Sequence, residues 1–117
     1  MKKPLFLILL LSIFLLPLYS QIIVEDVNIN ELEIKYCEIV GYNKSILGQK
    51  IVITVDYGQN YNLFQPQKIK KTDGEVIVFN SMIEALNFME DNGWQYVNNY
   101  AITMSNQNVY HYLLKRK

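Results

Sequence analysis

The sequence predicts an α+β fold in which a single helix packs on one face of a four- to five-stranded antiparallel sheet. Several stretches are rich in β-branched and aromatic residues and are bounded by turn residues, which is typical of strands. Only residues 81–92 have the periodicity of an amphipathic helix. Because one helix cannot cover two faces of a sheet, an antiparallel sheet with one covered face is the expected architecture.

The first twenty residues have the organisation of a secretory signal peptide. Lys2 and Lys3 provide a positive start, residues 5–16 are apolar, and Ser20 is a small residue before Gln21. The apolar run is about a dozen residues long, whereas a spanning helix needs roughly 20, although an uncleaved anchor remains the alternative. No cysteine follows the expected cut after Ser20, which disfavours a lipoprotein. We therefore expect a periplasmic or secreted protein without a membrane span after cleavage.

About 97 residues follow this segment, enough for one small domain with a single core. Residues 21–31 mix Ile22, Ile23 and Val24 with acids and asparagines and show no clear period. They are expected to form a flexible leader or a loosely attached edge segment. The single folded domain is therefore expected to span residues 32–117.

Two strands are expected at the start of this domain. Residues 32–42 are β-branched and aromatic, and residues 50–57 alternate well, with Ile51 and Ile53 on one face. Residues 43–49 have a length that suits a hairpin-like connection between them.

A second hairpin is expected over residues 68–79, after a polar loop at residues 58–67. Its turn contains Asp73 and Gly74, the strongest short hairpin signal in the chain. Glycine favours this position because it accepts the positive φ that the turn demands.

Residues 81–92 are the expected helix. Ser81 and Glu84 have the spacing of a capping box. Gly93 can supply the left-handed residue after the last turn. One apolar stripe recurs at the helical spacing, formed by Met82, Ala85, Leu86 and Met89.

Two further strands are expected at residues 94–104 and 109–114, around a turn at residues 105–108. Three aromatic residues would share one face of the first of these strands by strict alternation, provided that no bulge intervenes: Trp94, Tyr96 and Tyr100.

Charge and cysteine content exclude several classes of protein. Without Lys2 and Lys3 the chain has 9 basic and 11 acidic residues, so it carries no electrostatic signature for nucleic acid. Cys37 is the only cysteine, which excludes an intramolecular disulfide. Its place in a strand favours burial, and a disulfide-linked homodimer is the alternative.

The residues that could support catalysis are few. His111 is the only histidine, and a general base also needs an orienting partner and a nucleophile. No serine lies in a G-x-S-x-G elbow, so a small hydrolase around His111 is disfavoured. Glu38 and Asp56 lie on neighbouring strands and could pair as in glycosidases, but strand carboxylates usually form a solvated face. A structural zinc site needs four cysteine or histidine ligands, and the chain has one of each, so we expect no metal site. We likewise expect no catalytic residue and no cofactor.

Aromatic residues are the candidates for ligand or partner binding. Trp94 either packs beneath the helix or forms an exposed platform for a sugar or a protein. Tyr110 and Tyr112 are the better candidates for exposure, because two aromatic faces cannot both lie beneath one helix. Phe88 lies at the margin of the helical stripe, where an exposed ring would suggest a partner.

The order of several motifs resembles small exported bacterial proteins of unknown function. These motifs are Y-C-E-I-V-G at residues 36–41, D-Y-G-Q at residues 56–59, F-N-S-M-I-E-A-L-N-F-M at residues 79–89, G-W at residues 93–94 and Q-N-V-Y-H-Y-L-L at residues 107–114. More distantly, the G-W-Q-Y-V run is similar to a widespread family of short domains with a helix on a small antiparallel sheet. The resemblance implies the fold and the export, and it implies no activity.

Export, many aromatic residues and few catalytic groups together predict a non-enzymatic module that binds another protein or a glycan of the cell envelope. A carbohydrate-binding module with exposed aromatic residues is the first alternative. A small hydrolase around His111 is the second.

Overall fold

Within the described residues, one α-helix and two antiparallel sheets confirm the predicted α+β fold. The structure is a computed structural model, and it describes residues 20–43, 50–60 and 66–117. The expected signal peptide up to residue 19, most of the expected connection at residues 43–49 and half of the expected loop at residues 58–67 lie outside the described residues. No helix of the described part is long and apolar enough to cross a membrane.

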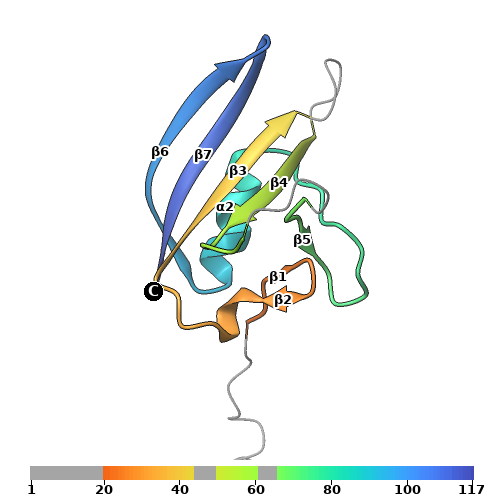
Figure 1. The fold of residues 1–117 in the computed structure, drawn as a ribbon, viewed down its shortest axis with the longest axis vertical. Helices are drawn as coiled ribbons and strands as arrows, with labels where there is room; N and C mark the ends of the chain where they lie inside the picture. Colours follow the sequence, from red (N-terminus) through yellow and green to blue (C-terminus); the bar gives the residue numbers. More distant parts are fainter. Residues whose placement is uncertain (1–19, 44–49, 61–65) are drawn as a thin grey trace, which may run out of the picture.

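The larger sheet has four antiparallel strands. These are β3 (Tyr36–Asn43), β4 (Ile51–Asp56), β6 (Trp94–Met104) and β7 (Gln107–Arg116). Their order across the sheet is β4-β3-β7-β6, so β4 and β6 are the two edges. Figure 1 shows that the hairpin of β6 and β7 extends beyond the ends of β3 and β4.

Helix α2 (Met82–Asp91) begins and ends as the sequence predicts. The Ser81 hydroxyl accepts a hydrogen bond from the Glu84 N–H at 3.1 Å. The Glu84 carboxylate reaches back one residue further than a capping box requires, and it accepts from the Asn80 N–H at 3.1 Å. Gly93 follows with φ +95°, the left-handed conformation that ends many helices.

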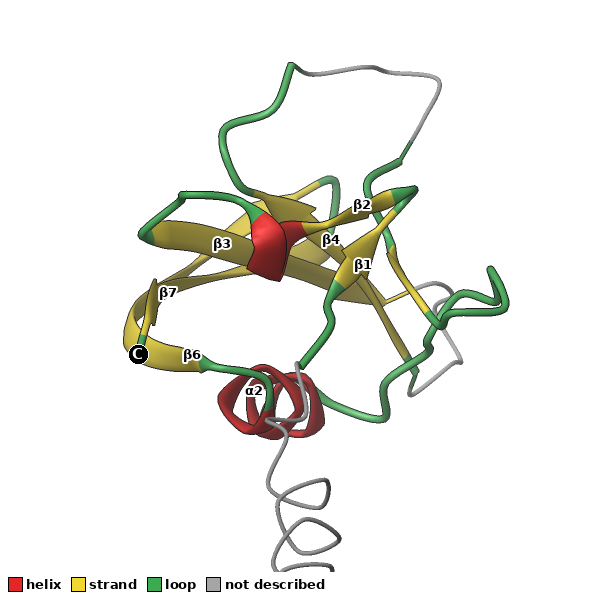
Figure 2. Ribbon diagram, turned by 90° about the horizontal axis from the view of Figure 1, so that it is seen from below, coloured by secondary structure: helices red, strands yellow, loops and turns green. Residues whose placement is uncertain are grey.

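The core lies between one face of the four-stranded sheet, α2 and the N-terminal segment (Figure 2). Ile39, Ile53 and Leu114 supply the sheet side of this core and are at most 1% exposed. Gly41 lets α2 approach the sheet closely, because a Cβ at this position would lie 2.2 Å from Sδ of Met82. The sheet face opposite α2 carries the side chains that alternate with these residues.

Residues 21–31 are not a flexible leader, and this prediction is wrong. They form β1 (Ile23–Val24), β2 (Val27–Asn28) and the 3-10 turn η1 (Ile29–Glu31). Ile22, Val24 and Ile29 are all fully buried in the core. The segment lacks a regular period because each of its elements is only two or three residues long, so burial follows tertiary packing and not a repeat.

The smaller sheet joins this segment to the predicted second hairpin. Its order is β2-β1-β5, where β5 is Ile69–Lys70. The predicted turn is present, since Gly74 has φ +89° and its N–H donates to the Lys71 carbonyl at 2.9 Å. After the turn the chain makes isolated bridges instead of a continuous strand: Val76 pairs with Lys70 of β5, and Phe79 pairs with Ile51 of β4.

Strand β6 contains a β-bulge between Tyr96 and Asn98. Tyr96 pairs with Leu114, but Asn98 pairs with Leu113, so Val97 is the additional residue. A bulge of one residue shifts the alternation of every residue that follows it. Trp94 and Tyr96 precede the bulge and share a face as predicted, but Tyr100 lies on the sheet face opposite α2, because the condition that no bulge intervenes is not met.

Cys37 is a free thiol that is buried in the core, which confirms the predicted burial. Burial raises the pKa of the thiol to about 12, because the charged thiolate loses solvation there. The smaller electrostatic effects of Arg116 and Asp56 oppose each other.

Candidate functional site

The candidate site is a pocket of about 330 Å³ on the sheet face opposite α2. Strands β3, β4 and β7 form its floor, and the chain after β4 contributes to its wall. Its lining residues are Glu38, Val40, Thr54, Val55, Asp56, Gln59, Gln67 and His111.

A histidine–carboxylate pair lies at the centre of this site. Nδ1 of His111 lies 2.7 Å from Oε1 of Glu38, and both side chains are largely buried. The cross-strand register produces this contact, because Val40 pairs directly with His111 and Glu38 lies two residues along the same strand. A carboxylate can only accept a hydrogen bond, so Nδ1 carries the proton and Nε2 is the ring nitrogen left for a ligand.

Tyr100 extends the site toward solvent. Its ring stacks on the His111 ring with 4.4 Å between centroids and an interplanar angle of 5°. The Tyr100 side chain is half-exposed. Desolvation and the neighbouring carboxylates of Glu38 and Asp56 raise its pKa, so its hydroxyl stays protonated and can donate a hydrogen bond.

The wall beside β4 is held by hydrogen bonds of the chain that follows the strand. The Gln59 side chain donates to the Val55 carbonyl and accepts from the Tyr57 N–H, both at 2.8 Å. Asp56 accepts from the Gly58 N–H at 3.0 Å, and Gly58 has φ +93°, which a residue with a side chain adopts at a cost. The amide and carboxylate groups are thus fixed in place before any ligand binds.

The pocket can bind polar groups, but its described lining contains no serine or cysteine nucleophile. The Thr54 hydroxyl donates to the Val40 carbonyl at 3.5 Å. Glu38 and Asp56 face each other directly across β3 and β4, as the sequence suggested, yet Glu38 is bonded to His111. Within the described part of the chain, no group of three or more histidine, cysteine or acidic side chains is placed to hold a metal ion.

Trp94 is not an exposed platform. It is 1% exposed, and its Nε1–H donates to Oδ1 of Asn30 at 2.8 Å. The Arg116 guanidinium lies 4.9 Å from the centre of its ring. Trp94 therefore packs between the helix end, the N-terminal segment and β7, which is the first of the two alternatives that the sequence left open.

The other three predicted binding residues also lie toward the core. Tyr110 and Tyr112 are half-buried on the α2 side of the sheet, so the expectation that they are the exposed aromatic residues is wrong. Phe88 is half-buried and packs edge-on against Phe79, with 5.6 Å between ring centroids. Tyr100 takes the exposed position because the bulge in β6 moves it to the opposite face.

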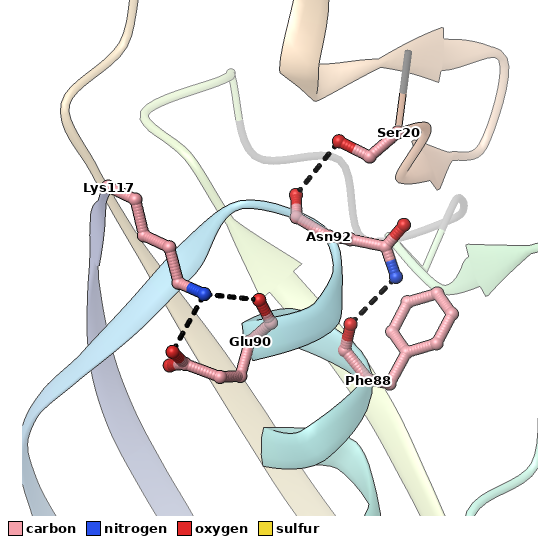
Figure 3. Close-up of polar contacts among 5 residues, drawn as sticks. All are labelled: Ser20, Phe88, Glu90, Asn92 and Lys117. Atoms are coloured by element: carbon pink, nitrogen blue, oxygen red, sulfur yellow. Dashed lines mark hydrogen bonds and ion pairs between the residues drawn. The ribbon is translucent and has the colours of Figure 1, made fainter. Parts of the chain in front are cut away.

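A second group of polar contacts lies at the C-terminal end of α2 (Figure 3). The Lys117 ammonium donates to the Glu90 carbonyl and pairs with the Glu90 carboxylate, both at 2.8 Å. The Asn92 amide donates to the Phe88 carbonyl at 2.7 Å, and the Ser20 hydroxyl donates to the Asn92 carbonyl at 3.3 Å. These bonds satisfy carbonyls that the helix end leaves unpaired, so this group stabilises the fold.

The sequence indicates Glu38, Asp56 and His111 as separate candidates, but it does not predict that they line one pocket beside Tyr100. The one local signal was the pair of asparagines at Asn98 and Asn99, which favour strands poorly. The Asn98 side chain accepts from the Asn99 N–H at 2.8 Å, a local bond that competes with the strand ladder beside the bulge. Comparisons with family models, curated proteins and solved structures found no match to this chain.

Proposed function

We propose that this chain is an exported, non-enzymatic binding module, and that the pocket around His111 binds a sugar unit of an envelope glycan. The observation that carries the proposal is the half-exposed Tyr100 ring stacked on His111 at the rim of a pocket that combines apolar surface with carboxylate and amide groups. A sugar presents an apolar C–H face to an aromatic ring and hydroxyl groups to carboxylates and amides.

The composition of the pocket supports this ligand class. Glu38 and Asp56 supply acceptors for hydroxyl groups, and the Gln59 amide and His111 add further polar contacts. Small-molecule sites commonly combine a hydrophobic surface with a few fixed polar groups in a volume of this order.

The start of the core supports the expected processing. Ile22 is fully buried, so a cut after Ser20 removes the apolar leader and keeps every core residue of the described chain. The cut also removes the hydrogen bonds of Ser20 with Asn92 and Asn30, which are polar contacts outside the apolar core. A cut only a few residues further along would remove Ile22 and Val24 from the core.

A hydrolase is the second candidate, and the His111–Glu38 pair is the observation that favours it. A carboxylate that orients a histidine is the supporting part of a catalytic triad. The described lining lacks the serine or cysteine that would complete it, so binding is the better-supported function.

The test uses His111 as a single reporter, because the chain contains only one histidine. Soluble saccharides, from hexoses to N-acetylated amino sugars, are titrated while the His111 ring resonances are followed by NMR. We expect saturable shifts with one class of sugar and no consumption of it. Trp94 fluorescence should change little, since that ring is buried.

Tyr100→Ala and Tyr96→Ala form a matched pair of variants for this titration. The two tyrosines lie on the same strand with similar exposure, but only Tyr100 contacts His111. We expect Tyr100→Ala to weaken binding about fivefold, from the loss of roughly 1 kcal/mol of aromatic contact. Equal weakening by both variants, or no shift of His111 with any sugar, would refute the proposed site. Turnover of a bound sugar or ester would favour the hydrolase.

A further inference from the structure

The two edges of the four-stranded sheet differ in how they are covered. At β4, the Ile51 N–H donates to the Phe79 carbonyl at 2.8 Å, and the Val55 N–H donates to the Gln67 carbonyl at 2.8 Å. At the opposite edge, β6 pairs only with β7 among the described strands. The outward backbone groups of β6 are therefore available to another strand.

Strand β6 lacks the features that usually protect such an edge. It contains no proline and no charged side chain, and the uncharged run continues from residue 92 to residue 114. Every residue of β6 after Trp94 is exposed. The bulge at Val97 interrupts only its first part, so residues 98–104 form an open and regular edge.

The two faces of this edge segment differ in character. On the pocket face, Tyr100, Ile102 and Met104 are 51%, 45% and 61% exposed. The α2 side of the same segment carries the small residues Ala101 and Thr103. An apolar row thus lies beside a backbone that can accept a strand.

We propose that β6 pairs antiparallel with β6 of a second copy of this chain, around a two-fold axis at Ala101. This register places Tyr100 opposite Ile102 of the second copy, and Ile102 opposite the second Tyr100. Aromatic and β-branched residues are a favourable cross-strand pair. The two four-stranded sheets then form one continuous sheet of eight strands.

The absence of charge favours a second copy as the occupant, and the available area sets its strength. On a strand that pairs with itself, a charged side chain tends to meet a like charge close by, and β6 carries none. Residues 98–104 offer roughly 500 Å² per copy, if each half-exposed side chain contributes about half of 150 Å². A standard interface buries about 800 Å² per partner, so the dimer should be weak and should form only at high protein concentration.

The first test measures sedimentation of the purified protein up to about 1 mM. We expect a concentration-dependent monomer–dimer equilibrium. Ile102→Lys should weaken it at least tenfold, because each lysine replaces an apolar pair with a charge. Val97→Lys is the matched control, since Val97 is equally exposed on the same strand but lies in the bulge, outside the paired segment. A monomer at every concentration would show that β6 does not pair with a second copy, and it would overturn the proposal.

The second test fixes the register. Ala101→Cys should form an intermolecular disulfide under mild oxidation, because directly opposed residues lie within disulfide distance. Val97→Cys should not, and the buried Cys37 does not interfere. Equal cross-linking by the two variants, or an association that Ile102→Lys leaves unchanged, would contradict β6 pairing. Tyr100 belongs to both proposed surfaces, but Ile102→Lys, Ala101→Cys and the Val97 variants change neither Tyr100 nor a residue that lines the His111 pocket. Failure of this proposal is therefore distinct from failure of sugar binding.

Discussion

The free energy of unfolding should fall less at alkaline pH when Cys37 is replaced by alanine, because the variant lacks the buried thiol that titrates. The Cys37 thiol has a pKa raised by burial from 9.0 to about 12 in the folded protein. Above pH 9 the unfolded chain loses this proton while the folded chain keeps it, so the folded state binds more protons. The free energy of unfolding must then fall as pH rises from about 9 to about 12, and the full contribution is present below pH 9.

The magnitude follows from the width of this window. Each pH unit is worth about 1.4 kcal/mol, so the thiol should cost about 2–3 kcal/mol of stability at pH 11 relative to pH 8. Urea unfolding of the native protein and of Cys37→Ala, measured from pH 7 to pH 11, gives the difference between the two free energies of unfolding. The alanine variant loses some packing at every pH, but this loss is constant. It therefore does not affect how the difference between the two free energies of unfolding changes with pH.

Two results would refute this reasoning. A difference between the two proteins that stays constant to pH 11 would mean that the thiol titrates normally in the folded state. Rapid reaction of the native protein with a thiol reagent at pH 8, or a disulfide-linked dimer on a non-reducing gel, would show that Cys37 is accessible. We expect labelling only through unfolding, because the side chain is 3% exposed.

Three further predictions follow from particular contacts. Gly41→Ala should lower the free energy of unfolding by about 1–3 kcal/mol, because its Cβ would overlap Sδ of Met82; chemical denaturation that shows no loss would mean that the Met82 side chain moves aside. Ile22→Ala should lower the free energy of unfolding by about 2–5 kcal/mol in the same assay, since Ile22 is fully buried. A loss below about 0.5 kcal/mol would support the flexible leader instead. Tyr100 should have a pKa above the ordinary value of about 10, and Glu38→Gln should lower this pKa in an NMR titration. An unchanged Tyr100 pKa in that variant would mean that the Glu38 charge does not act on Tyr100.

The sequence by itself determined those elements whose cause is local. The helix at Met82–Asp91 follows from a serine cap, an apolar stripe and a terminal glycine that all lie within a dozen residues. The turn at Gly74 has the same kind of cause, since the required φ belongs to one residue. Burial of Cys37 in an apolar strand also follows from its own neighbours along the chain.

Only the tertiary structure decided which side chains meet across the sheet. The contact between His111 and Glu38 depends on the register of β7 against β3, and those residues are 73 positions apart in the chain. The bulge at Val97 reversed the faces of all later β6 residues, so Tyr100 lies exposed beside the pocket. The register of β7 against β3 places Tyr110 and Tyr112 on the core side of the sheet. Alternation in a sequence indicates that a strand has two faces, but pairing between distant strands determines which face is covered. One additional residue in a strand moves every later side chain to the other face.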